Sequence, residues 1–498
     1  MPTDMPTAIG SETEIVIIGC GPVGALLANL LGLQGIATVV LEREAAAYSL
    51  PRAVQFDDEV MRILQTVGLA EAMQPLVHVV PGMKFVDGSG RLLLDWQRPV
   101  EVGLQGWHSS YRFHQPDLER VLREGFGRWP TLSFFSRTEV FAIEETMDAL
   151  VVLYEDLVTG TLNQCRARYV VGCDGARSLV RRLIGQPMED LGFHERWLVA
   201  DVILKRPRPD LGDYSVQHCN PARPATYVRG TGNRRRWEIA VLPEENGETI
   251  TRTANVFELL KPWLSPEDAE LERAALYTFH SALAQKWRRG RLMIAGDAAH
   301  LTPPFLGQGM CAGMRDAGNL AWKLGRVLRG QNNDLLLDTY QAERSPHVRE
   351  YIELAVRLGG LINSKAMEAA VPGVGMEGGA AARMASIKPR LGDGLSAGRR
   401  GVAGDISRQP LLQAGIRLDD HVGYGFAAIL RPDFAAELPS DVFEQFAVRG
   451  IMPVIADEPD LATWLHDIGA PAVLVRPDRY MLGEAQSVSE LQALAALV

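Results

Sequence analysis

The first strongly apolar stretch of the chain is the β-branched run Glu14–Ile18, which a glycine-rich turn separates from a second one, Ala25–Leu33. A short continuous run is typical of a buried parallel strand, whereas the second stretch carries apolar residues on all sides, as a buried helix does. A third run, Ala37–Leu41, follows. The pattern predicts a strand, a helix and a strand, the opening of an α/β fold with a parallel sheet.

Two further segments read as a strand followed by a turn, Tyr169–Gly175 and Leu292–Asp297. The second of them leads into a long helical stretch, Gly309–Leu328. Between the two, the segment Val199–Leu242 alternates apolar and polar residues, which is typical of antiparallel strands. We therefore expect an antiparallel sheet inserted into the α/β fold.

The composition of the chain changes in its last quarter. Residues 365–404 are rich in Gly, Ala and Ser, which predicts irregular structure or a linker. Beyond them strand and helix patterns alternate again, and the last helix opens with Ser487 and Glu490 at the spacing of a capping box. This tail is predicted to be a small separate α/β domain.

Composition excludes several classes of protein. Lys plus Arg number 51 against 61 Asp plus Glu in 498 residues, a net charge of −10, so a nucleic-acid partner is not expected. Apolar residues make up 47% of the chain, as in ordinary globular proteins. The cysteines are five, without a CxxC pair, which predicts a reduced compartment and neither disulfides nor a metal site.

The one stretch that resembles a signal peptide or a membrane span is Ile15–Leu33. Acidic residues rather than lysines precede it, and several glycines and a proline interrupt it. We therefore expect no membrane partner and a cytoplasmic location.

The turn between the first strand and the first helix reads Gly19-Cys20-Gly21-Pro22-Val23-Gly24, a GxGxxG pattern. The first glycine makes the tight turn, Gly21 lets a pyrophosphate approach the backbone, and Gly24 permits close packing of helix on strand. Glu42, at the end of the second strand, supplies the acceptor for a ribose hydroxyl. The alternative is a glycine turn in an unrelated α/β fold.

A second pattern lies at Arg291–Met310, where a buried strand ends at Asp297 and the loop Pro303-Pro304-Phe305-Leu306-Gly307 leads into a helix. The aspartate can accept a hydrogen bond from a ribityl hydroxyl, and the helix start stabilises negative charge on a reduced flavin ring. The alternative is a strand followed by an ordinary loop.

Three separated motifs resemble those of the single-component FAD-dependent aromatic hydroxylases, typified by para-hydroxybenzoate and phenol hydroxylases. They are GCGPVG with Glu42, CDGARS at 173–178, and GDAAHLTPPFLGQGM followed by DAGNLAWKL at 316–324. The resemblance runs from about Glu14 to Arg349, and PRAVQFDDEVMRILQTVGL is most similar to 3-(3-hydroxyphenyl)propionate hydroxylases.

The resemblance implies an α/β fold of the para-hydroxybenzoate hydroxylase type. Its parts would be a discontinuous Rossmann-like FAD-binding domain (residues 1–80, 105–190 and 285–365) and an antiparallel substrate-binding sheet (81–104 and 191–284). A linker (366–404) and a thioredoxin-like domain without redox cysteines (405–498) would follow. In that domain a cis-proline is expected at Ala470-Pro471.

The resemblance also implies roles for single residues. Besides the three glycines and Glu42, non-covalent FAD would be held by Asp297 and by the backbone around Gly307, Gly309 and Met310. The other FAD-binding positions would be Arg43, Arg52, Gln115 and Asp174. Pro304, through its carbonyl, would lie beside substrate and flavin. The family usually has Asn where this chain has Cys311, and Arg52 and Gln115 also read as a loop arginine and a helix cap.

The implied reaction is hydroxylation of a phenolic substrate with NADH or NADPH and O₂, through a flavin C4a-hydroperoxide. His218 is the first candidate for the proton acceptor, with Tyr214 and Tyr227 as alternatives, and Arg223 or Arg229 would pair with a substrate carboxylate. Alternation alone does not fix which side chains face inward, because a slip of one residue reverses all of them. A homodimer is a further expectation.

Two other classes remain open at this point. One is a flavin-binding protein that senses or sequesters a ligand, and the other is a halogenase or C=C reductase on the same fold. Stimulation of NAD(P)H oxidation by a phenol separates them from a hydroxylase.

Overall fold

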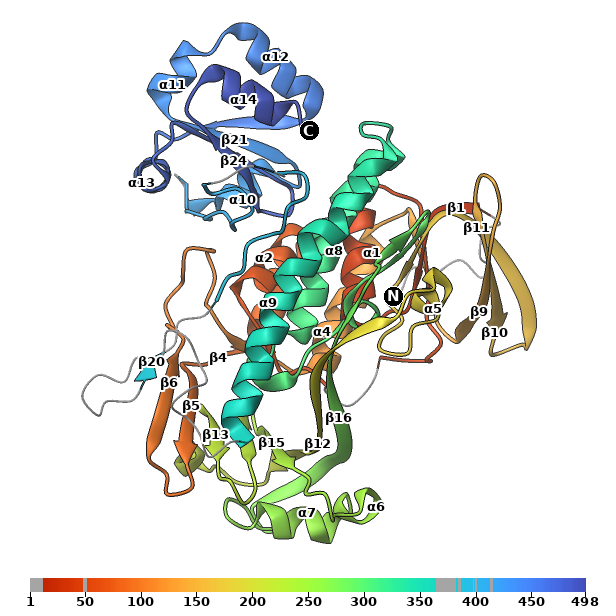
Figure 1. Cartoon of the computed structure of the whole chain (residues 1–498), viewed down its shortest axis with the longest axis vertical. Coiled ribbons are helices and arrows are strands. Elements are labelled where there is room, and N and C mark those ends of the chain that lie inside the picture. Colours follow the sequence, from red (N-terminus) through yellow and green to blue (C-terminus); the bar gives the residue numbers. More distant parts are fainter. Residues whose placement is uncertain are drawn as a thin grey trace.

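Two long helices run through the middle of the computed structural model, α8 (Gly309–Leu328) and α9 (Asp338–Asn363) (Figure 1). The structure describes residues 12–47, 52–363, 382–383, 387–396, 398, 401–412 and 415–498. A mixed sheet lies on one side of the two helices, a large and mostly antiparallel sheet lies below them, and a small α/β unit sits at the far end (Figure 1).

The mixed sheet confirms the predicted α/β opening. Strand β1 (Glu12–Ile18) pairs in parallel with β2 (Thr38–Leu41) and β11 (Thr161–Gly172), and β11 pairs in parallel with β18 (Leu292–Ile294). Helix α1 (Pro22–Leu33) begins earlier than predicted, because the fixed φ of Pro22 suits a first helical turn. The sheet is completed by β8 (Leu132–Phe135), β9 (Thr138–Glu145), β10 (Leu150–Asp156) and β17 (Arg288–Arg289).

Several short elements cover this sheet and join it to the rest. Strands β3 (Gln55–Phe56), β7 (Tyr111–Arg112) and β4 (His78–Val79) form a small antiparallel sheet. The helices are α2 (Asp58–Thr66), α3 (Ala70–Met73), α4 (Gln115–Glu124) and α5 (Leu179–Ile184). The loop before α8 contains the short 3₁₀ turn η5 (Pro304–Leu306).

The second sheet has the order β19-β16-β12-β15-β14-β13-β5-β6-β20. Its central strands β12 to β15 pair antiparallel, as the alternation of Val199–Leu242 predicted. The bounds are β19 (His300–Leu301), β16 (Ala269–Ala284), β12 (Met188–Leu204), β15 (Arg234–Ala240), β14 (Ala225–Arg229), β13 (Ser215–Cys219), β5 (Gly82–Asp87), β6 (Leu92–Gln97) and β20 (Ala382–Arg383). In this sheet β13 pairs with β5, and β6 with β20, in parallel.

The two faces of this second sheet have different neighbours. One face packs against α6 (Gly247–Ile250) and α7 (Thr253–Leu260), and its core includes Tyr227 and Trp237. The other face packs against η5 and α9, and its core includes Trp197, Cys219 and Phe305. We call these the outer face and the inner face. Only the inner face adjoins the loop that carries Pro304.

The C-terminal unit has the thioredoxin-like topology that was expected. Its sheet order is β22-β21-β23-β24, with β22 parallel to β21 and the other pairs antiparallel. Ser487 caps the last helix, as predicted, by accepting from the backbone N–H of Glu490. The Ala470–Pro471 bond is trans, so the expectation of a cis-proline is wrong.

The elements of this unit are β21 (Phe426–Leu430), β22 (Ile451–Ile455), β23 (Ala472–Val475), β24 (Met481–Ala485), α10 (Leu418–Val422), α11 (Pro432–Glu437), α12 (Ser440–Arg449), α13 (Pro459–Ile468) and α14 (Val488–Ala495). Within the predicted linker, β20 adds a strand to the second sheet and Lys388 forms an ion pair with Asp58 at 2.7 Å. Parts of the predicted linker thus pack on the body, and the exact domain boundaries stay a prediction.

Candidate active site

The glycine turn between β1 and α1 is tightly packed except at one position. A Cβ on Gly19, whose φ is +96°, would lie 2.5 Å from the Cys173 carbonyl oxygen, and one on Gly24 would lie 2.1 Å from the Gly19 oxygen. A Cβ on Gly21, the N-cap of α1, would meet no described atom within 4 Å. The helix start at Gly21 is therefore open, and its backbone N–H groups are placed to bind a phosphate.

Glu42 lies at the end of β2, beside this turn. Its Oε2 accepts a hydrogen bond from the Cys20 backbone N–H at 2.7 Å, and its Oε1 accepts one from Glu44 at 2.8 Å. A carboxylate oxygen has a second lone pair, so a ribose hydroxyl can still donate to either oxygen. The neighbouring Arg43 is exposed and pairs with Glu44.

Gln115 ties the loop that carries Arg52 to helix α4. Its Oε1 accepts from the backbone N–H groups of Arg52 at 2.9 Å and Ala53 at 2.8 Å, and its Nε2 donates to Glu119. The N-cap of α4 is His114, so the interpretation of Gln115 as the helix cap is wrong. The side chain positions the Arg52 loop instead.

The CDGARS motif lies directly against the glycine turn, since the Cα of Asp174 is 3.1 Å from the Cβ position of Gly19. The Asp174 carboxylate accepts from the Ser178 hydroxyl at 2.5 Å and from the Leu179 N–H at 2.7 Å. It therefore caps the start of α5 and fixes the shape of this turn.

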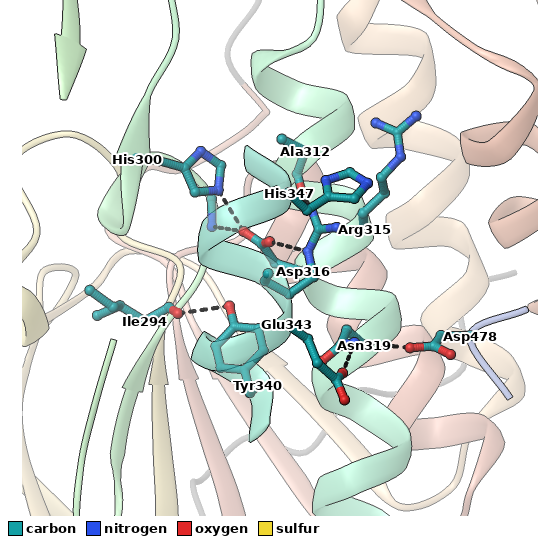
Figure 2. Close-up of polar contacts among 12 residues, drawn as sticks. Ile294, His300, Ala312, Arg315, Asp316, Asn319, Tyr340, Glu343, His347 and Asp478 are labelled. Atoms are coloured by element: carbon teal, nitrogen blue, oxygen red, sulfur yellow. Dashed lines mark hydrogen bonds and ion pairs between the residues drawn. The ribbon is translucent and has the colours of Figure 1, made fainter. Parts of the chain in front are cut away.

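Asp297 is exposed, and in the described part of the chain its carboxylate makes no hydrogen bond or ion pair. The backbone of the turn that carries Asp297 is hydrogen-bonded by Asp316 of α8, whose carboxylate lies beside His300 in Figure 2. Oδ2 of Asp316 accepts from the Gly296 backbone N–H at 3.1 Å and lies 2.6 Å from His300 Nε2. Asp297 is thus free to bind a ligand, while the buried Asp316 holds the turn that carries Asp297.

Figure 2 also shows what holds Asp316 in place. Arg344 of α9 donates through Nε to its other oxygen at 2.9 Å, and the side chains of Asp316, His300 and Arg344 are all fully buried. Burial alone would raise the pKa of Asp316, but His300 and Arg344 beside it keep that pKa below its ordinary value. No role was predicted for His300 or Arg344 from the sequence.

The loop before α8 presents a helix start without a side-chain cap. The Pro304 carbonyl accepts from the Gly307 N–H at 2.8 Å, and Gly307 has a φ of +65°. Gln308, the N-cap, instead donates to Asp57 at 3.1 Å and accepts from Arg315 at 3.0 Å. The first N–H groups of α8, at Gly309 and Met310, therefore remain available for an electron-rich ligand.

Cys311, the departure from the family pattern, is fully buried in this helix start. Its Sγ lies 3.6 Å from the Gly307 oxygen and 3.8 Å from the Gln55 oxygen. Burial raises the pKa of the thiol above its ordinary value. The side chain thus packs into the turn as a neutral group.

Three of the predicted catalytic side chains lie on the outer face or at its edge. His218 packs on Trp263 with ring centroids 5.2 Å apart, and Tyr227 packs on Trp237 at 5.1 Å. The Tyr214 ring lies under Lys84, which pairs with Val216 of the same face. Because Gln217 and Cys219 of β13 face inward, the intervening His218 does not, and we do not retain it as the proton acceptor.

The two arginines predicted to bind a substrate carboxylate already have protein partners. Arg223 forms a bidentate ion pair with Glu245, at 2.9 and 2.7 Å. Arg229 pairs with Asp213 at 3.0 Å and donates to backbone carbonyls of the following turn. The side chains of Arg223 and Arg229 thus hold the ends of strands in place, and we do not retain them as substrate ligands.

The inner face instead carries a row of buried polar residues that were not predicted from the sequence. Glu238, Thr226 and Gln217 lie side by side on β15, β14 and β13. Thr226 donates to the Gln217 side chain at 2.6 Å, whereas Glu238 has only a distant ion pair with Arg236, at 3.8 Å. Burial raises the pKa of Glu238 despite the nearby Arg236.

This polar row borders an apolar wall. Trp197, two residues from the neighbour of Glu238 on β12, packs on Phe305 of η5 with ring centroids 5.7 Å apart. The inner face therefore packs on η5, which leads into the start of α8. The strand register is the signal that would have assigned these residues to the inner face.

Comparison with known proteins agrees with this geometry. Residues 12–355 match the model of the family described as "FAD binding domain". A protein of Rhodococcus jostii (strain RHA1), named "Probable NADH-specific resorcinol 4-hydroxylase", is 38% identical over 98% of this chain and 95% of its own. A "3-(3-hydroxy-phenyl)propionate/3-hydroxycinnamic acid hydroxylase" of Mycobacterium sp. (strain JLS) is 33% identical over 95% and 89%.

Solved structures share the fold at low identity. The flavin-dependent monooxygenase PieE, in complex with FAD and substrate, superposes with a TM-score of 0.80 at 19% identity, covering 98% of this chain and 99% of that one. Aklavinone-11 hydroxylase, with FAD and aklavinone, gives 0.79 at 20% identity over the same shares. The chain therefore belongs to the FAD binding domain family and, within it, to the FAD-dependent aromatic hydroxylases.

Proposed function

We propose that this FAD-dependent monooxygenase hydroxylates a small, single-ring phenol and uses NADH as its reductant. The observation that carries the proposal is the buried polar row around Glu238, which lies on the same face as the apolar wall beside Pro304. The relatives named as resorcinol and hydroxyphenylpropionate hydroxylases support this substrate class, and one of them is named NADH-specific. A ligand sensor, a halogenase and a C=C reductase are not favoured.

The residues present fit FAD in four places. The open helix start at Gly21 would bind the pyrophosphate, Glu42 the adenosine ribose, and Asp297 the ribityl chain. The uncapped start of α8 at Gly309 and Met310 would face the electron-rich edge of the flavin ring. The chemistry that FAD supplies when bound is hydride acceptance from the nicotinamide and activation of O₂.

The chain's own contribution to the reaction is proton transfer and exclusion of water. A phenolate is a better nucleophile than a phenol, so a positioned base that takes the hydroxyl proton accelerates the step. We assign this role to Glu238, because its buried carboxylate faces inward and has no hydrogen bond in the described part of the chain. Trp197 and Phe305 cover the region with apolar surface, which keeps water from the reacting atoms.

Substrate-stimulated coenzyme oxidation tests this function. Purified enzyme with bound FAD should oxidise NADH slowly alone and much faster with resorcinol or 3-(3-hydroxyphenyl)propionate, with a ring-hydroxylated product. NADPH and a non-phenolic ring such as toluene serve as controls. Equal NADH oxidation with and without every phenol tried would contradict the proposal.

Two properties of the whole protein belong to the proposal as well, a cytoplasmic location and a homodimeric state. In the described residues no helix is long and apolar enough to cross a membrane. Sedimentation of the purified protein would test the dimer.

A further inference from the structure

A pocket opens next to the turn that carries Pro304. Leu306 of η5 and Gln308, the N-cap of α8, form one wall, and the aromatic side chains of Trp96 and Tyr351 line it from β6 and α9. A lining of aromatic and apolar side chains with a few polar groups is typical of small-ligand sites.

The charged groups that line this pocket are paired, with one exception. Asp57 pairs with Arg315 at 2.5 Å, and Asp58 pairs with Lys388 at 2.7 Å. Arg98 is only 6% exposed and donates a single long hydrogen bond, at 3.3 Å, to the Ser110 hydroxyl. In the described residues no carboxylate lies within 4.0 Å of its guanidinium.

A second buried guanidinium lies behind the first. Arg112, two residues beyond Ser110, is 5% exposed and donates only to neutral groups, Gln55 Oε1 at 2.6 Å and the Ser215 hydroxyl at 2.8 Å. Its Nε has no partner among the described residues. Burial and the positive charge of Arg98 lower the pKa of Arg112 to about 9, although Glu238 acts in the opposite direction.

Two neighbouring buried cations without an ion pair are unfavourable until an anion joins them. Arginine binds oxyanions with strong, charge-assisted hydrogen bonds. The Arg98 guanidinium lies over the Trp96 ring, 4.5 Å from its centroid, so the cation and the aromatic lining lie side by side in the pocket. Gln55, which bonds Arg112, lies against Gly307 in the Pro304 turn. The missing anion is therefore expected on an aromatic ligand next to the reaction centre.

We propose that Arg98, with Arg112 behind it, is the anion-binding element of the substrate pocket and holds the ionised oxygen of a single-ring aromatic substrate. The inference rests on the proposed function and narrows its substrate class to aromatic anions. The same chemistry has two sources, a phenolate oxygen and a side-chain carboxylate.

Equilibrium binding without NADH tests the proposal apart from turnover. The FAD-loaded enzyme is titrated with resorcinol, with 3-(3-hydroxyphenyl)propionate and with the methyl ester of that acid, and flavin absorbance reports the Kd. A tenfold or greater preference for the acid over the ester identifies a carboxylate. Resorcinol binding that tightens at least tenfold from pH 7 to pH 9 identifies a phenolate.

In either case the variant Arg98→Gln should abolish the preference and weaken binding of the preferred anion at least tenfold, while Arg98→Lys, which keeps the charge, should retain part of it. Arg112→Gln should act in the same direction. Arg166→Gln, at an exposed ion pair with Asp148, is the control and should leave every Kd unchanged.

Kd values for all three probes within twofold of wild type in Arg98→Gln and Arg112→Gln, at normal FAD content, would overturn the proposal. If Arg98→Gln does not fold, the same result in Arg112→Gln alone overturns it. A wild type that prefers the anion but shows no phenol-stimulated NADH oxidation would refute the proposed function and still support this site.

Discussion

Asp297 lies beside the predicted FAD site, and in the described part of the chain its carboxylate makes no hydrogen bond or ion pair. Hydrogen bonds to a charged group contribute about 1.5–3 kcal/mol, so Asp297→Ala should weaken FAD binding by roughly one to two orders of magnitude. The FAD content of the purified protein and the Kd for added FAD measure this. Asp148→Ala, at an exposed position, is the control, and full FAD occupancy in Asp297→Ala would rule out the assignment.

Glu238 should control how the rate depends on pH. Its pKa is raised by burial, and the protonated carboxyl cannot accept a proton. Hydroxylation by the wild type should therefore fall as pH decreases through this raised pKa. Glu238→Gln should lose about 10²-fold in kcat and lose the acidic limb as well.

The matched comparison for that profile is His218→Asn, because this ring packs on Trp263 on the outer face. Its kcat and its acidic limb should equal those of the wild type. An unchanged profile in Glu238→Gln, or a lost limb in His218→Asn, would contradict the assignment of the proton acceptor.

At the residue scale the sequence predicts the strands of the second sheet but not which way their side chains point. Alternation predicts that neighbouring residues such as Gln217 and His218 point to opposite faces of the sheet, but it does not tell which of the two faces inward. The direction is decided by tertiary packing, since Gln217 pairs with Phe85 of the inner core and Trp263 covers His218. Arg98 and Arg112 could not be predicted for the same reason, because they lie outside any motif and only tertiary packing brings them together.

At the scale of the first β-α-β element, two glycines of one turn should respond differently to alanine. A Cβ on Gly24 would collide with the Gly19 oxygen at 2.1 Å, whereas a Cβ on Gly21 meets no described atom within 4 Å. Gly24→Ala should therefore lower the melting temperature by several degrees. Gly21→Ala should keep the fold and lose FAD affinity, because the methyl group occupies the approach of the pyrophosphate.

Thermal unfolding of the apoprotein and FAD titration separate these two effects. Equal melting temperatures for Gly24→Ala and the wild type would show that the close packing of α1 at Gly24 does not contribute to the stability of the protein. Unchanged FAD affinity in Gly21→Ala would show that the pyrophosphate does not approach this turn.

Elements with a strong local signal could be predicted from the sequence. Helix α8 spans Gly309–Leu328, as its pattern indicated, and the strands β1 and β2 lie where the apolar runs are. The support that α8 gives to the Asp297 turn could not be predicted, because Asp316, His300 and Arg344 meet only after three elements have packed. The pairing of β20 with β6 could not be predicted for the same reason, since it has no local pattern.

At the scale of the whole molecule, buried ion pairs join the C-terminal unit to the central helices. Glu343 of α9 accepts from Lys323 of α8 at 2.6 Å and from Arg476 of the C-terminal unit at 2.7 Å, and all three side chains are almost fully buried. Removal of one partner from such a network costs about 3–5 kcal/mol, because the remaining charges stay buried. Glu343→Gln should therefore lower the free energy of unfolding by that amount.

The acid stability of the protein should depend on the same carboxylate. Arg476 and Lys323 hold the pKa of Glu343 below its ordinary value despite burial. Its contribution to stability is then present above the ordinary glutamate pKa and is lost as pH falls below it. Denaturant unfolding at pH 7 and pH 4 measures this.

The exposed Glu124→Gln serves as the control and should change stability by less than about 0.5 kcal/mol. Equal unfolding curves for Glu343→Gln and the wild type would show that the buried pairs do not hold the C-terminal unit to the body.

The most direct test of the monooxygenase reaction is the origin of the oxygen atom in the product. Enzyme with bound FAD is supplied with NADH, resorcinol or 3-(3-hydroxyphenyl)propionate, and ¹⁸O₂ in unlabelled water, and the product is analysed by mass spectrometry. A flavin monooxygenase places one labelled atom on the aromatic ring for each NADH that is productively used. Product that carries oxygen from water, or NADH oxidation without a hydroxylated product for any phenol, would contradict the assignment of this protein as a flavin monooxygenase of phenols.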